Sequence, residues 1–130
     1  MAYLKDKLDQ LENALKRWQE SLEVDFSTLN RDAAIQRFEF SVELLWKTLK
    51  IYLEDREKII CHSPRACFRE AKNIFALSDS EVEKCLQMVE DRNLASHLYS
   101  EKMADELYKK LESYHKLAEK ITRDIKSKID

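Results

Sequence analysis

RFEFSVELLWKTLKIYL, residues 37–53, decides the fold, because it carries apolar side chains on more than one side of a helix. Its apolar residues recur at steps of three and four, the repeat of an α-helix. One stripe consists of Phe38, Val42, Leu45, Leu49 and Tyr52, and a second of Phe40, Leu44 and Ile51, with Trp46 between them. Such a helix must be covered on more than one side. It is either the central helix of a bundle or also supplies a subunit interface.

The same helical repeat continues on both sides of this stretch, in a chain of 130 residues that has no glycine and one proline. Without glycine, tight β-hairpin turns are disfavoured, so we predict an all-α fold. Asn30 is the expected N-cap of the helix that contains residues 37–53. Ser63 followed by Pro64 marks another helix start, and Ser78 with Glu81 has capping-box spacing. Helices are expected at residues 3–22, 30–54, 63–75 and 100–129. A further helix is expected to begin at residue 78 and to lead into residues 92–99.

The expected architecture is an up-and-down four-helix bundle with an additional short helix, forming a single domain over residues 1–130. The absence of glycine excludes P-loop enzymes, Rossmann dehydrogenases and glycine–serine nucleotidyltransferases, whose phosphate loops need it. With 23 basic and 25 acidic side chains, the net charge of −2 gives no argument for non-specific nucleic-acid binding. Any RNA contact would need a local patch.

Apolar runs of only a few residues exclude a transmembrane span, and the first six residues lack the apolar core of a signal peptide. The odd number of cysteines, three, indicates reduced thiols in a cytoplasmic protein. Cys61, His62 and Cys67 do not supply the four ligands of a structural zinc site. We therefore expect neither a metal nor a cofactor.

Residues 92–99, RNLASHLY, carry the candidate catalytic side chains. Arg92 can bind phosphate through its planar, permanently charged guanidinium, and His97 can accept or donate a proton near neutral pH. At about 100° per residue, positions five apart point roughly 140° away from each other. Arg92 and His97 therefore converge only if the helix ends or distorts between them, or if a second subunit brings its own copy. Asn93 shares a face with His97.

Two further groups are candidate substrate-binding residues. Arg65, Arg69 and Lys72 form a basic stripe from the positive end of a helix, either a phosphate-facing surface or a solvated face. Glu43 and Glu39, four residues apart, are the polar remainder of their helix and could face a site.

Three stretches together resemble the HEPN superfamily, and within it the bacterial nucleotidyltransferase substrate-binding protein group. They are residues 37–53, Ser63-Pro64-Arg65, and Asp91-Arg92-Asn93 followed by His97 and Tyr99. The resemblance covers nearly the whole chain, in order.

The resemblance implies a small all-α bundle that forms a homodimer and is encoded beside a minimal nucleotidyltransferase, in many cases as a toxin–antitoxin pair. The family's Arg-polar-x3-His motif corresponds to Arg92, Asn93 and His97. In the ribonuclease members these residues form a metal-independent site across the dimer. The extended form of the motif ends in His-x-Tyr, which makes Tyr99 the residue that a partner would modify with AMP.

Three functions follow as alternatives. The first is a HEPN-type partner that binds a nucleotidyltransferase subunit together with nucleotide or RNA. The second is a metal-independent endoribonuclease toxin, in which His97 transfers protons, Arg92 stabilises the phosphorane, and Asn93 orients His97 or the phosphate. The third is a helical scaffold in which the motif is inert.

Overall fold

The computed structural model describes residues 2–129, and within them every regular element is helical. The chain is an all-α bundle, as its sequence predicts. Its elements are α1 (Ala2–Glu23), α2 (Thr28–Arg56), α3 (Pro64–Ile74), α4 (Asp79–Leu94), the 3₁₀ turn η1 (Ala95–His97), α5 (Glu101–Tyr108) and α6 (Leu111–Ile129).

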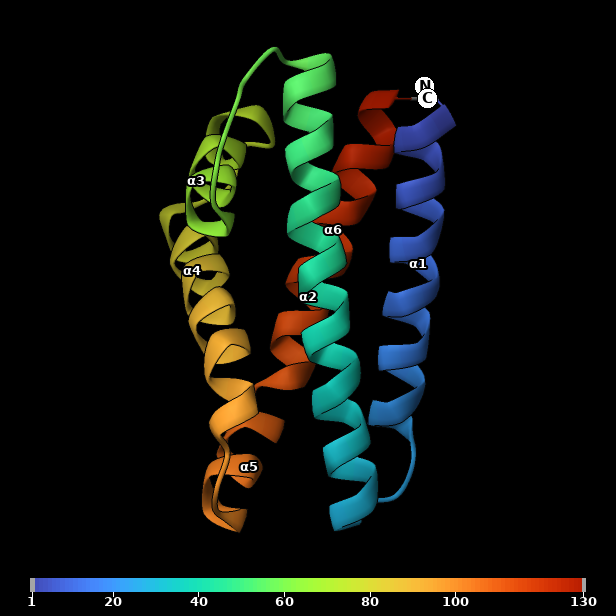
Figure 1. Cartoon of the computed structure of the whole chain (residues 1–130), viewed down its shortest axis with the longest axis vertical. Coiled ribbons are helices and arrows are strands. Elements are labelled where there is room, and N and C mark those ends of the chain that lie inside the picture. The colour runs from blue at the N-terminus through green and yellow to red at the C-terminus, as the bar shows by residue number, and fades with distance from the viewer. Residues whose placement is uncertain (1, 130) are drawn as a thin grey trace.

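The long helix α2 is the centre of the bundle. It contacts α1, α3, α4, α5 and α6, and Figure 1 shows α1 on one side of it and the α3–α4 pair on the other. The first of its two apolar stripes is buried, and Phe38, Leu45 and Leu49 are fully enclosed. The second is only partly covered, since Phe40 remains 60% exposed. The expectation of a central helix is therefore correct.

Two expected helix boundaries are wrong. Helix α2 is capped by Ser27, whose side chain accepts a hydrogen bond from the backbone N–H of Asn30 at 3.0 Å, so Asn30 lies inside the helix. The expected helix over residues 100–129 is two helices, because α5 ends at Tyr108 and α6 begins at Leu111. The apolar positions Leu107 and Leu111 keep helical spacing across this break, so periodicity gives no sign of it.

The other expected helix starts are correct. Ser63 caps α3 with Pro64 in its first turn, and Ser78 and Glu81 form a complete capping box on α4. Each cap satisfies backbone N–H groups that have no partner within the helix. These starts fix where α3 and α4 begin, and α4 carries the candidate motif at its other end.

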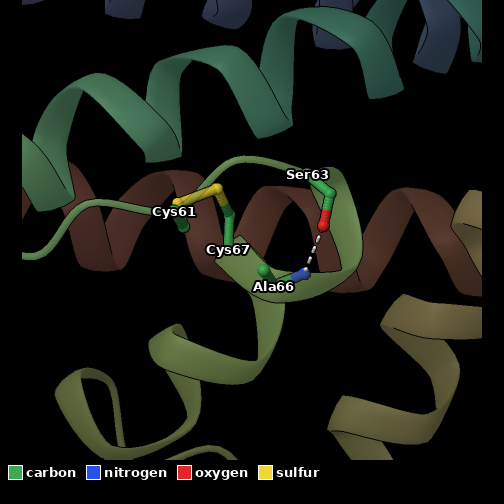
Figure 2. The surroundings of a disulfide bond; sticks show 4 residues. All are labelled: Cys61, Ser63, Ala66 and Cys67. Carbon is green, nitrogen blue, oxygen red and sulfur yellow. Dashed lines mark hydrogen bonds between the residues drawn. A yellow bond between two sulfur atoms is a disulfide. The ribbon is translucent and has the colours of Figure 1, made fainter.

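The expectation of three reduced cysteines is wrong in this structure. Cys61 and Cys67 form a disulfide, and both are buried (Figure 2). Cys61 lies in the connector before α3 and Cys67 in the first turns of α3. The Ser63 cap, which accepts a hydrogen bond from the N–H of Ala66 at 3.1 Å, turns the chain back between them. Cys85 is free and buried.

No helix among residues 2–129 combines the length and the apolar character that crossing a membrane requires.

Candidate functional site

The candidate motif spans the end of α4. Arg92 and Asn93 lie in the last turn of this helix, which ends at Leu94, and His97 closes the 3₁₀ turn that follows. The helix therefore does end between Arg92 and His97, which is one of the two conditions for their convergence. This distortion alone does not bring the two side chains together in one chain.

Arg92 is held against the central helix by Glu43. Its Nη2 lies 2.7 Å from Oε2 of Glu43, and its Nη1 lies 3.5 Å from Oδ1 of Asn93. Glu43 also accepts a hydrogen bond from Nε1 of Trp46 at 3.2 Å and pairs with Lys47 at 3.0 Å. Partial burial alone would raise the pKa of Glu43, but these hydrogen bonds and the charge of Arg92 outweigh it and lower the pKa. Glu43 is thus an ionised anchor for Arg92.

A second carboxyl group lies beside this pair. Burial raises the pKa of Glu39, and the positive charge of Arg92 only partly offsets that effect. The Nε of Arg92 is buried without a hydrogen-bond partner among residues 2–129. Arg92 therefore keeps unused donor capacity while its guanidinium rests against α2.

His97 has a different partner. Its Nδ1 lies 2.8 Å from the hydroxyl of Tyr99, and the two rings meet edge to face with centroids 5.9 Å apart. Both side chains are exposed, and Tyr99 is 83% accessible. Within the part of the chain that the structure describes, no hydrogen bond or ion pair joins His97 to Arg92 or Asn93. One copy of the chain therefore presents the arginine and the histidine separately.

The basic stripe expected on α3 is divided among three environments. Lys72 pairs with Asp79 at 2.7 Å, and this hydrogen bond lowers the pKa of Asp79. Arg69 is exposed. Arg65 lines a cleft together with Lys84 of α4 and residues at the start of α6. The three cations therefore have different surroundings in this structure.

Sequence reasoning missed a buried carboxylate next to Arg92. Asp91 is 9% exposed and accepts hydrogen bonds from the hydroxyl of Tyr114 at 2.6 Å, from Lys110 at 3.2 Å and from Gln87 at 3.2 Å. Burial, followed by the bond to Asp91, raises the pKa of Tyr114. Asp91 lies three residues after the buried Met88, at a position of α4 where the helical repeat expects an apolar side chain. That spacing was the available sequence signal that Asp91 is buried.

A buried arginine was also missed. Arg31, which is 3% exposed, lies in the first turns of α2 and pairs with Glu101 at 2.6 Å and Asp105 at 3.0 Å on α5, and with Asp32 at 2.9 Å. Its hydrogen bonds to Glu101 and Asp105 raise its pKa further. Helix α5 directly follows Tyr99, so Arg31 fixes the segment that carries the exposed end of the motif. No local pattern identifies it, since its partners lie 70 and 74 residues away.

Among residues 2–129 there is no group of three histidine, cysteine, aspartate or glutamate side chains that could hold a metal ion.

Comparison with known proteins places the chain in a family. Residues 6–127 match the family model described as nucleotidyltransferase substrate binding protein like. A crystal structure of a protein from Thermus thermophilus is similar, with 37% sequence identity and a TM-score of 0.84, over 88% of this chain and 98% of that one. No curated protein matches. Because the family model covers nearly all of the chain, this protein belongs to the nucleotidyltransferase substrate binding protein like family.

Proposed function

We propose that this chain is a HEPN-type, substrate-binding partner of a minimal nucleotidyltransferase, in a two-component system of the toxin–antitoxin kind. The observation that carries the proposal is the family match over residues 6–127. In this proposal residues 1–130 act as one domain that binds the nucleotidyltransferase subunit together with nucleotide or RNA.

The chain acts as a homodimer in this proposal, and the separation of Arg92 from His97 supports it. Arg92 faces α2 and is held by Glu43, whereas His97 is exposed beside Tyr99. A second copy could set its own His97 against Arg92 and Asn93, and so complete a site that one chain leaves open. Apolar side chains that stay exposed, such as Phe40, offer area for such an interface.

Tyr99 supports a regulatory role for the partner enzyme. Its 83% exposed ring is accessible to another protein. Its phenolic oxygen would attack the α-phosphate of ATP, pyrophosphate would leave, and the phenolic proton would pass to a base. The added AMP would bring bulk and negative charge beside His97, on the segment that carries the arginine.

A specific observation also favours a second function, a metal-independent endoribonuclease. His97 is exposed, and the side chain of Arg92 remains 35% exposed beside its contact with Glu43, so both can reach an RNA ligand. His97 would deprotonate a 2′-hydroxyl or protonate the leaving oxygen. Arg92 would stabilise the phosphorane, and Asn93 would orient the histidine or the phosphate.

The first experiment separates these functions. Purified protein is incubated with total RNA in excess chelator, beside His97→Ala and the matched control His62→Ala, which removes an exposed histidine outside the motif. Cleavage by the parent and by His62→Ala, but not by His97→Ala, supports the ribonuclease. No cleavage by AMP-free parent, together with co-elution of the chain with its nucleotidyltransferase, supports the binding partner.

Two further measurements test the assembly. Light scattering after size exclusion should give the mass of a dimer, and a strictly monomeric protein would refute the composite site. Incubation with the nucleotidyltransferase and ATP should add AMP to the parent and to Tyr3→Phe, another exposed tyrosine, but not to Tyr99→Phe. AMP on Tyr99→Phe would refute the assignment of Tyr99.

The proposed system works in the cytoplasm, where its RNA and nucleotide ligands are. Disulfides persist chiefly in oxidising compartments, so in the cytoplasm we expect the Cys61–Cys67 pair to be reduced to two thiols. Trapping thiols in intact cells with an alkylating agent, followed by mass spectrometry, measures whether this pair is oxidised where the protein works.

A further inference from the structure

A cleft of about 710 Å³ lies between α4, the start of α6 and the first turn of α3. We call it the α4–α6 cleft. Arg65 lines it from α3, Lys84 and Leu86 from α4, Lys110 from the turn before α6, and Tyr114 from the start of α6. Its volume is within the range of about 300–1,000 Å³ that small-molecule sites occupy.

Cations with spare hydrogen-bond capacity gather in this cleft. Its charged lining consists of Arg65, Lys84, Lys109 and Lys110, together with the carboxylates of Glu83 and Glu90. Lys84 donates to the hydroxyl of Ser113 at 2.6 Å, a neutral partner. For Arg65 and Lys109 no ion pair exists within residues 2–129. Other lysines of the same helices are neutralised, as Lys120 is by Glu81 at 3.0 Å.

Lys110 also lines the cleft but has a different role, because it already has an ion-pair partner. It pairs with the buried Asp91 at 3.2 Å, and Asp91 is also bound by Tyr114. This cluster holds α4 on α6 and leaves the other three cations for a ligand. The cleft also lies where α6 begins at Leu111, so the positive end of that helix dipole adds to the positive electrostatic potential in the cleft.

We propose that the α4–α6 cleft binds the phosphate groups of a nucleotide, with Arg65, Lys84 and Lys109 as their ligands. Three cations without an ion-pair partner suit a ligand with several negative charges, and the arginine guanidinium can bind two oxygens of one phosphate. Leu86 and Tyr114 give the cleft an apolar wall beside these charges. Nucleotide as the ligand class rests on the proposed function, whereas the position of the site rests on the cleft alone.

This site is separate from the Arg92 motif. Asp91 and Arg92 are neighbours on α4, but Asp91 binds Lys110 and Tyr114, whereas Arg92 binds Glu43 on α2. Consecutive helical residues point about 100° apart. Helix α4 therefore carries a nucleotide site on its α6 side and the motif on its α2 side.

The test is calorimetric titration of the full-length protein with ATP at low ionic strength. Lys84→Ala and Lys109→Ala should each weaken ATP binding about tenfold, the loss of one charge-assisted contact. The matched controls Arg69→Ala and Lys102→Ala remove exposed cations outside the cleft and should change affinity less than about twofold. Inorganic triphosphate should displace ATP, and adenosine should not.

Equal weakening in the cleft variants and the controls would overturn the proposal, because the attraction would then be non-specific. Displacement by adenosine, or the absence of any ATP binding, would overturn it as well. If Arg92→Ala abolishes ATP binding while Lys84→Ala does not, the nucleotide binds at the motif, and the inference fails while the proposed function stands. If ATP binding follows the cleft variants but the nucleotidyltransferase does not co-elute, the proposed function fails and the inference stands.

Discussion

Tyr114→Phe removes one hydroxyl group and tests whether the Asp91 cluster holds the motif helix in place. The hydroxyl donates to Oδ2 of Asp91 at 2.6 Å, and both residues are buried, at 3% and 9% exposure. The phenyl ring that remains can keep its stacking on Phe38, whose centroid is 5.7 Å away. The substitution therefore creates almost no cavity, and its effect is the loss of one hydrogen bond.

The magnitude follows from the partners that remain. A hydrogen bond to a charged group contributes about 1.5–3 kcal/mol, and leaving a buried acceptor short of a donor costs a similar amount. Asp91 keeps Lys110 and Gln87, so the lower end applies, and we expect a loss of about 1.5 kcal/mol. With a urea m-value of about 1–3 kcal/mol/M, the midpoint should fall by roughly 0.5–1.5 M.

The assay is urea unfolding at pH 7 followed by far-ultraviolet circular dichroism, with Tyr3→Phe as the control. Tyr3 is 58% exposed, so its substitution should change stability by less than about 0.5 kcal/mol. A double-mutant cycle with Asp91→Asn isolates the pair. A loss in Tyr114→Phe no larger than that of the control, with no coupling in the cycle, would refute the role of this cluster.

Three other predictions concern titration and cysteine chemistry. Burial raises the pKa of Glu39 above its ordinary value of 4.5, so its favourable contribution is present below about pH 4.5 and is lost as pH rises through the raised pKa. Glu39→Gln should therefore leave stability unchanged near pH 4 and increase it at pH 7, as measured by urea unfolding at both pH values; a loss at pH 7 would contradict this. Reducing the disulfide, or replacing Cys61 and Cys67 with serine, should cost about 2 kcal/mol for a loop of sequence separation 6, and an unchanged melting temperature would contradict it. Burial raises the pKa of Cys85 to about 12, so iodoacetamide at pH 8 should label it only after unfolding, as mass spectrometry would detect.

The candidate site was only partly predictable. The sequence pointed to Arg92, Asn93, His97 and Tyr99, because arginine and histidine at the end of a helix are the side chains that phosphate chemistry needs. It also marked Glu43 as a polar position, and Glu43 is the partner of Arg92. It did not predict that His97 would bind Tyr99, since a pair two residues apart forms only after the helix has ended.

The residues that sequence reasoning missed have distant partners. Arg31 meets α5 across 70 residues, and Asp91 meets Tyr114 across 23. Charged residues are ordinarily exposed, so the only local sign of burial was the apolar spacing of Asp91 on α4, and Arg31 had no such sign. The three cations of α3 form one stripe in the sequence, but they have different partners in the structure. Lys72 pairs with Asp79, whereas Arg65 lines the α4–α6 cleft together with its lysines.

The sequence by itself determined that this protein is helical, that residues 37–53 form a helix covered on more than one side, and where α3 and α4 begin. Those features depend on apolar spacing and on caps within four residues, which are local. The structure decided three further local features: Ser27 rather than Asn30 caps α2, the last helix breaks before Leu111, and Cys61 reaches Cys67. It also decided which partner each charged group found. The physical reason is that burial and pairing depend on segments far apart in the chain, and these come together only when the bundle packs.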